Sequence, residues 1–139
     1  MNNIKFLIII SISIILLNAC TIAEPQYTTS ATIYLINETS VVIKSDDISG
    51  YVIQPGDTLI RSESLTSEYK EKPSINNYQP FANFAGRRMF KYGDDSSQCE
   101  YGLIRIENYE DRKETSPLEF EFTFRFTEEK RENSEPCTF

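Results

Sequence analysis

Three cysteines carry the most distinctive covalent chemistry available to this sequence of 139 residues, which contains no histidine. Without histidine the chain cannot form a Ser-His-Asp or Cys-His catalytic group, a histidine-ligated zinc site or an imidazole acid or base near neutral pH. An enzyme built from it would have to use carboxylates, tyrosine, lysine or arginine, and no catalytic constellation of these is recognisable. We therefore expect a protein that is not an enzyme and needs no cofactor.

Cys20 directly follows Leu17-Asn18-Ala19 at the end of an apolar segment. Lys5 supplies a positive start, and Phe6–Leu17 is an uncharged run that suits a signal-peptide core better than a membrane span. A small residue directly before cysteine is typical of a bacterial lipobox, in which the cysteine is acylated and becomes the new first residue. We predict that residues 1–19 are removed and that several acyl chains on Cys20 anchor the protein stably in a membrane. The alternatives are an ordinary signal peptide with an incidental cysteine, or an uncleaved membrane anchor.

The residues after Cys20 bear on the membrane that receives the anchor. Thr21 stands where many lipoproteins retained in an inner membrane carry aspartate, so the expected location is the outer membrane. Glu24 is the only acidic residue close to the cysteine. The periplasmic face and the cell surface therefore both stay open.

Cys99 and Cys137 remain as a pair if Cys20 carries lipid. An exported protein enters an oxidising compartment, where an even remainder of cysteines favours a disulfide. Closing this span would stabilise the fold by roughly 4 kcal/mol, mostly by constraining the unfolded chain. The alternative is two reduced thiols, with Cys137 on a frayed tail.

Charge and length bound the class of protein. The chain has 14 basic and 21 acidic residues, a net charge of −7, and loss of Lys5 with the signal leaves −8. A negative chain without a basic stripe repels phosphate backbones, so a nucleic-acid partner is not expected. We assign residues 20–28 to a tether and 29–139 to a single domain.

The domain has the composition of short strands separated by turns. β-Branched and aromatic residues indicate strands, and Asn, Asp, Gly and Pro mark the turns between them. The stretch Ser62–Gln79 shows neither the alternation of a strand nor the period of a helix, so we predict a long loop there. Thr32–Ile36 and Val41–Lys44 are expected to pair as a hairpin. The remaining strands are expected at Tyr51–Gln54, Thr58–Arg61, Arg88–Tyr92 and Gln98–Ile106.

The clearest element lies at the C-terminal end. Over Leu118–Thr127 the apolar side chains alternate strictly with polar ones, which predicts a strand with one aromatic and one charged face. The aromatic face is expected in the core, and an exposed ligand platform is the alternative. Residues 128–133, capped by Thr127, are expected to form a short helical turn. Together these signals predict an all-β protein, an antiparallel sandwich of about seven strands.

Two further groups of side chains could bind a ligand. Asp46-Asp47 and Asp94-Asp95 could offer oxygen ligands to calcium, but they lack the spaced ladder of an EF-hand, so solvated turn residues are the better interpretation and no metal site is expected. Aromatic residues around the long loop could form a contact surface for glycan or protein, although we expect them to pack the loop onto the sandwich; they are Tyr69, Tyr78, Phe81 and Phe84.

Several short motifs resemble small uncharacterised lipoproteins of Bacteroidota envelopes. They are Phe81 with the following Phe-Ala-Gly, Arg-Met-Phe-Lys-Tyr at 88–92, Ile106-Glu107-Asn108-Tyr109 and Phe124-Arg125-Phe126-Thr127-Glu128-Glu129. The resemblance covers most of residues 30–133. It implies an immunoglobulin-like β-sandwich and an acylated cysteine, and it carries no known active site. Asp57-Thr58-Leu59 is also similar to the short O-glycosylation motif of that lineage, which makes Thr58 a candidate acceptor, although Asp57 could simply belong to the turn.

These observations favour a membrane-anchored lipoprotein that acts as a non-enzymatic binding or structural module of the bacterial envelope. Its partner would be an unidentified envelope protein or glycan. An alternative is an inhibitor or immunity-type lipoprotein that blocks an envelope-targeting hydrolase. A carboxylate-dependent glycan hydrolase is a third option, which a domain of this size leaves little room for.

Overall fold

The computed structural model describes residues 25–45, 50–68, 72–81, 89–94 and 98–137, and they form a β-sandwich with one short α-helix. The predicted all-β sandwich is thus confirmed. In chain order the elements are β1 (Gln26–Asn37), β2 (Ile43–Ser45), β3 (Val52–Ile53), β4 (Thr58–Glu68), β5 (Phe90–Tyr92), β6 (Cys99–Glu100), the 3-10 helices η1 (Gly102–Ile104) and η2 (Ile106–Asn108), β7 (Asp111–Ser116), β8 (Glu119–Phe126) and the helix α2 (Glu128–Glu132).

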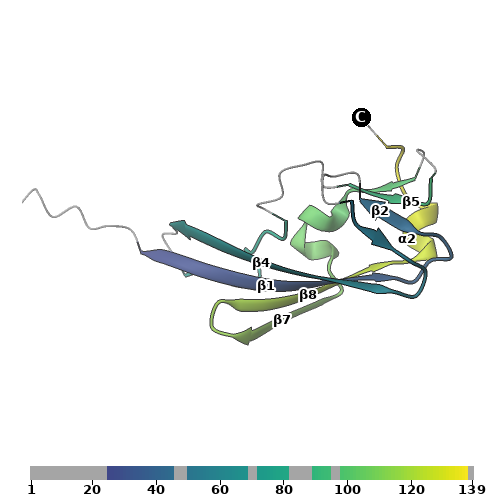
Figure 1. Cartoon of the computed structure of the whole chain (residues 1–139). Coiled ribbons are helices and arrows are strands. Elements are labelled where there is room, and N and C mark those ends of the chain that lie inside the picture. The colour runs from purple at the N-terminus through teal and green to yellow at the C-terminus, as the bar shows by residue number, and fades with distance from the viewer. Residues whose placement is uncertain (1–24, 46–49, 69–71, 82–88, 95–97, 138–139) are drawn as a thin grey trace, which may run out of the picture.

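The strands form two four-stranded sheets. The larger sheet has the order β4-β1-β8-β7 and the smaller one β3-β2-β5-β6. Neighbouring strands are antiparallel except β1 and β8, which run parallel in the centre of the larger sheet. Figure 1 shows that the smaller sheet covers only one end of the larger sheet. The two 3-10 helices lie beside the smaller sheet and cover the adjoining part of the larger sheet.

The aromatic row of β8 forms the centre of the core. Its phenylalanines, at positions 120, 122, 124 and 126, are between 0 and 2 % exposed. They lie beside Ile33 and Leu35 of the neighbouring β1, on the same face of the larger sheet, and pack against aromatic side chains from outside that sheet. Phe122, for example, stacks on Tyr78 at 5.3 Å and meets Tyr109 edge-on at 5.7 Å between ring centroids. The predicted inward orientation of this row is confirmed.

Asn37 changes the course of the chain between β1 and β2. The predicted hairpin of Thr32–Ile36 with Val41–Lys44 is wrong, because these segments lie in different sheets. Asn37 is fully buried, and its Nδ2 donates to the carbonyl oxygens of Val41 at 2.8 Å and Ile53 at 2.9 Å. The buried amide of Asn37 thus satisfies backbone carbonyls of two other segments. These bonds stabilise the bend at which the chain leaves the larger sheet for the smaller one.

β4 is longer than its sequence suggests. The loop expected over Ser62–Gln79 is wrong in its first part, because β4 continues to Glu68 and pairs with β1 along its whole length. β1 in turn begins at Gln26, so it takes in three residues assigned to the tether. The strand signal of β4 is weak because its inward-facing positions include two charged side chains, Arg61 and Glu63, which form an ion pair at 3.6 Å.

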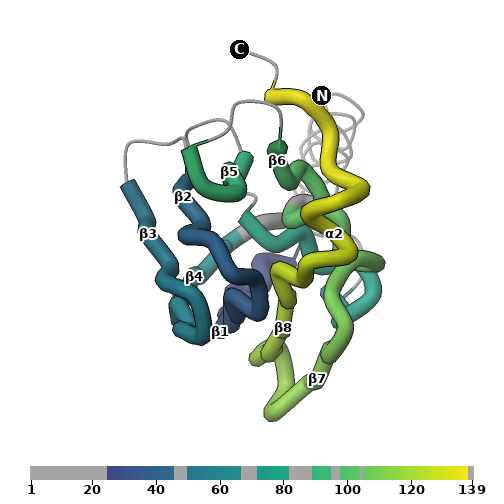
Figure 2. Tube along the Cα trace, turned by 90° about the vertical axis from the view of Figure 1, so that its right-hand side faces the viewer, coloured from purple at the N-terminus to yellow at the C-terminus, as the bar shows by residue number. Residues whose placement is uncertain are grey.

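The segment Gln98–Ile106 differs from the expected strands. Only Cys99 and Glu100 are extended, and two 3-10 helices follow. The predicted helical turn after β8 is confirmed: Thr127 caps α2 through its Oγ1, which accepts a hydrogen bond from the Lys130 amide at 3.2 Å. Figure 2 shows that α2 and the C-terminal segment run past β6, to which the segment is joined by a bond of 2.8 Å from the Cys99 amide to the Glu135 carbonyl.

Candidate functional site

A groove of about 500 Å³ lies between β6, the 3-10 helices and the C-terminal segment. We call it the C-terminal groove. Its volume falls in the range of ligand pockets, about 300–1,000 Å³. One part of its lining comes from the segment between β6 and η2 and the other from β8, α2 and the residues after them; the lining residues are Cys99, Glu100, Tyr101, Gly102, Arg105 and Asn108, followed by Phe124, Lys130, Asn133, Ser134 and Glu135.

Two polar side chains of the groove, Glu100 and Asn108, form hydrogen bonds with the backbone of Gly102. Its amide donates to Glu100 Oε1 at 2.7 Å, and its carbonyl accepts from Asn108 Nδ2 at 2.9 Å. A β-carbon at this position would lie 2.5 Å from Asn108 Nδ2 and 2.7 Å from Glu100 Oε1. A side chain here would displace Asn108 and Glu100, so the glycine leaves room for the two hydrogen bonds that hold the start of η1.

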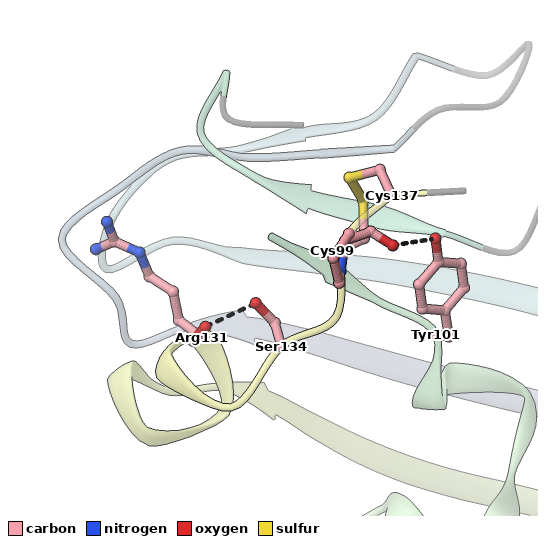
Figure 3. Close-up of a disulfide and its surroundings, with 6 residues drawn as sticks. Cys99, Tyr101, Arg131, Ser134 and Cys137 are labelled. Atoms are coloured by element: carbon pink, nitrogen blue, oxygen red, sulfur yellow. Dashed lines mark hydrogen bonds between the residues drawn. A yellow bond between two sulfur atoms is a disulfide. The ribbon is translucent and has the colours of Figure 1, made fainter. Parts of the chain in front are cut away.

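A disulfide joins Cys99, which lines the C-terminal groove, to Cys137. The two Cα atoms are 5.2 Å apart, and the bond spans 38 residues. Figure 3 shows the hydroxyl of Tyr101 directed toward the segment that carries Cys137, and it donates to the Pro136 carbonyl at 3.3 Å. This hydrogen bond holds the half-buried ring of Tyr101 in the groove lining. The expected pairing of the two cysteines is thus confirmed.

Lys130 supplies a cation that is already satisfied. Its Nζ lies 2.5 Å from Glu110 Oε1, 2.8 Å from the Arg125 carbonyl and 3.8 Å from the centroid of the Phe124 ring. An ammonium group has three donors, and these contacts engage all of them. We therefore expect Lys130 to stabilise the packing of α2 against β8 and not to bind a ligand.

A second hollow, of about 330 Å³, adjoins the 3-10 helices. We call it the amide hollow, because three of its lining side chains are carboxamides. Such side chains carry both donors and acceptors in one plane. The lining residues are Asn76, Asn77, Tyr78, Gln79, Arg105, Ile106 and Glu107.

Arg105 belongs to the lining of both hollows. Its side chain is exposed, whereas its backbone is tied by a bond of 3.0 Å from its amide to the Gly102 carbonyl. Among the described residues the guanidinium group has no hydrogen bond or ion pair. Its five donors are therefore available to a ligand that reaches this point.

A buried carboxylate holds the segment that carries the amide hollow. Glu63 Oε1 accepts a hydrogen bond from the Tyr78 hydroxyl at 2.8 Å, and the Phe81 amide donates to both carboxylate oxygens at 3.2 Å. The side chain of Glu63 is 9 % exposed. Hence β4 fixes the position of both ends of the stretch between Tyr78 and Phe81.

Arg61 completes this arrangement, which we call the Glu63 cluster (Arg61, Glu63, Tyr78 and Phe81). Its Nε lies 3.6 Å from Glu63 Oε2, and its guanidinium carbon lies 4.9 Å from the centroid of the Phe81 ring. Phe81 has φ of 60°, the left-handed region that costs a residue with a β-carbon about 1–2 kcal/mol. The bonds to Glu63 and the full burial of the ring offset this strain.

Two buried tyrosines near the site stay protonated at neutral pH. Burial raises the pKa of Tyr109 far above its ordinary value, and the charge of Glu63 raises it further. Burial likewise raises the pKa of Tyr92, whose hydroxyl donates to Glu100 Oε2 at 3.3 Å. A raised pKa makes both phenols poor acids near neutral pH, and both hydroxyls donate hydrogen bonds, Tyr92 to Glu100 and Tyr109 to the Leu103 carbonyl.

Of the other predicted residues, Tyr78 lines the amide hollow, whereas Thr58, Asp94 and Phe81 line neither hollow. Thr58 is exposed at the start of β4. Asp94 pairs with Lys44 at 2.5 Å, and the hydrogen bond from Lys44 lowers the pKa of its carboxyl group. Tyr78 and Phe81 are buried in the core, as expected for packing. Predictions for Cys20, Tyr69, Phe84, Asp46-Asp47 and Asp95 lie outside the described residues.

Sequence reasoning missed Arg105 and the three carboxamides. Arg105 stands in a stretch predicted as strand, and the three carboxamides stand in the predicted long loop. The Gly102–Asn108 spacing is the one local signal that could have located the groove, because Asn108 bonds back to Gly102.

Between residues 25 and 137, no helix in the described segments is long and apolar enough to cross a membrane. No protein-family model, no curated protein and no solved structure matches the chain.

Proposed function

We propose that the chain is a membrane-anchored, non-enzymatic binding module of the bacterial envelope, and that the C-terminal groove with the amide hollow is its recognition site for a glycan or protein. The observation that carries this proposal is the guanidinium of Arg105, which faces both hollows and has no partner among the described side chains. Around it stand polar groups on a lining held by the hydrogen bonds of the C-terminal segment and by the bonds to Gly102.

The chemistry of the site supports binding better than turnover. Its lining has no histidine, since the chain has none, and burial raises the pKa of the nearby tyrosines still further from neutral pH. Glu100, a carboxylate of the groove, is engaged by the Gly102 amide and the Tyr92 hydroxyl. Fixed donors and acceptors in a concave site suit recognition of a polar ligand.

Replacing Cys20 with alanine tests the proposed anchor. We expect the wild-type protein to partition into the detergent phase and to incorporate an alkyne-tagged fatty acid, and the C20A variant to do neither. The measurement is in-gel fluorescence after click labelling, together with phase partition. Cleavage of the wild-type signal without any label would contradict a lipoprotein.

Replacing Tyr101 with alanine tests the recognition site. Tyr101 is half-buried in the groove lining, and Tyr34 of β1 is a matched control, because it is half-buried on the outer face of the larger sheet. With protein purified from membranes in detergent, we expect Y101A to lose about tenfold or more of its binding to envelope polysaccharide fragments or envelope proteins, and Y34A to bind like the wild type.

The readout is a glycan array together with crosslinked capture of envelope proteins, and a thermal unfolding curve of each variant confirms that it is folded. Y101F, which keeps the ring, should retain most of the binding. If Y34A loses binding and Y101A does not, the recognition site lies on the outer face of the larger sheet and the proposal fails.

A further inference from the structure

We propose that the C-terminal groove and the amide hollow together bind a linear, uncharged oligosaccharide whose chain passes over Arg105. This inference rests on the proposed function, because it names the ligand class of the same site. Both hollows share Arg105 in their lining, so a ligand that fills them in succession must pass its guanidinium group. An elongated polymer fits such a pair of hollows better than a single small molecule.

The charges of the site argue against a polyanion. Three carboxylates line the two hollows, those of Glu100, Glu107 and Glu135, against two cations. One cation, Lys130, is neutralised by Glu110 at 2.5 Å. An acidic polysaccharide would gain one free guanidinium and meet three carboxylates, on a chain whose net charge is −7.

The same charges suit a chain of hydroxyl groups. Each hydroxyl donates one hydrogen bond and accepts others, so it can give a proton to a carboxylate and accept from a guanidinium or carboxamide. Bonds that involve a charged partner are about twice as strong as neutral ones. The carboxamides of Asn76, Asn77 and Gln79 extend this pattern along the amide hollow.

Tyr101 offers the apolar contact that such a ligand needs. Its hydroxyl is tied to the Pro136 carbonyl, as Figure 3 shows, so the ring is held as part of the groove lining. A ring of fixed orientation can pack against the apolar face of a sugar with little loss of side-chain freedom. We therefore assign stacking to Tyr101 and hydroxyl binding to Arg105.

Titration calorimetry with defined oligosaccharides tests the inference. The probes are neutral linear hexasaccharides of the β-glucan, xylan and mannan types and a hexauronate of equal length. The protein is the lipoprotein in detergent. We expect at least one neutral probe to bind about tenfold or more tightly than the hexauronate, and its affinity to change little between low and high salt, because no net charge is neutralised.

Arg105→Gln is expected to weaken binding of that neutral probe about tenfold or more, the usual effect of losing hydrogen bonds from a charged donor. Arg112→Gln is the matched control, because Arg112 is exposed on β7 and has no side-chain partner among the described residues. It should bind like the wild type. Both variants change exposed side chains, so both are expected to unfold at the wild-type temperature.

The possible outcomes separate this inference from the function on which it rests. Tighter, salt-sensitive binding of the hexauronate overturns the inference alone. Equal binding by R105Q and R112Q overturns the inference and also removes the observation that carries the proposed function. Capture of a protein through Tyr101 with no saccharide bound also overturns the ligand class and leaves the binding module intact. If no partner depends on Tyr101, the proposed function falls together with the inference.

Discussion

Glu63→Ala is expected to lower the free energy of unfolding by about 3–5 kcal/mol, the usual cost of removing one member of a buried ion pair. The variant removes the acceptor of the Tyr78 hydroxyl and the Phe81 amide and the counter-charge of Arg61. The carboxylate is 9 % exposed, so water can replace it only poorly. The strained backbone of Phe81, with φ of 60°, loses the bonds that hold it.

The measurement is equilibrium unfolding in urea, followed by tyrosine fluorescence and far-ultraviolet circular dichroism. Glu63→Gln keeps an acceptor oxygen, so it should cost less, about 1–3 kcal/mol. Glu114→Ala is the control, because Glu114 is exposed on β7, and its effect should stay within about 0.5 kcal/mol. Equal stability of E63A and E114A would show that the Glu63 cluster does not hold the fold.

The Glu63 cluster also predicts an effect on binding. It fixes the stretch between Tyr78 and Phe81, next to the carboxamides that line the amide hollow. At temperatures where E63Q is still folded, we expect it to bind the partner less tightly than the wild type, although Glu63 lines neither hollow. A loss of stability without any loss of affinity would mean that the cluster serves only the core.

The elements predicted well from sequence depend on local patterns. The alternation of β8 and the cap of α2 by Thr127 are encoded within a few residues, and both appear as expected. β4 could not be predicted in full, because Arg61 and Glu63 make an inward face look polar until their mutual contact is known. The corner at Asn37 depends on the Ile53 carbonyl, which is distant in sequence.

The candidate site was still less accessible to sequence reasoning. The disulfide could be predicted by counting cysteines. The groove beside it could not, because it forms only where the fold brings η1, β8 and the C-terminal segment together. Arg105 carries no local signal at all. Its importance comes from the absence of a side-chain partner among the described residues and from its place in the lining of both hollows.

Removal of the disulfide is expected to lower the free energy of unfolding by about 4 kcal/mol, the chain-entropy value for a bond that spans 38 residues. The variant is C99S/C137S, compared with the wild type in urea with and without dithiothreitol. The reductant should lower the midpoint of the wild type to that of the variant. It should leave the variant unchanged, because the proposed acylated Cys20 has no disulfide to reduce.

The effect on binding should be small, in contrast to that of Glu63. Three hydrogen bonds of the wild-type structure do not need the sulfur atoms: from the backbone amide of residue 99 to the Glu135 carbonyl at 2.8 Å, from the Tyr101 hydroxyl to the Pro136 carbonyl at 3.3 Å and from Ser134 Oγ to the Arg131 carbonyl at 2.7 Å. These bonds hold the C-terminal segment in the folded state, whereas the disulfide acts mainly by restricting the unfolded chain. Under conditions where C99S/C137S is fully folded, its affinity should therefore stay within about threefold of the wild type, and a complete loss would show that the disulfide itself shapes the C-terminal groove.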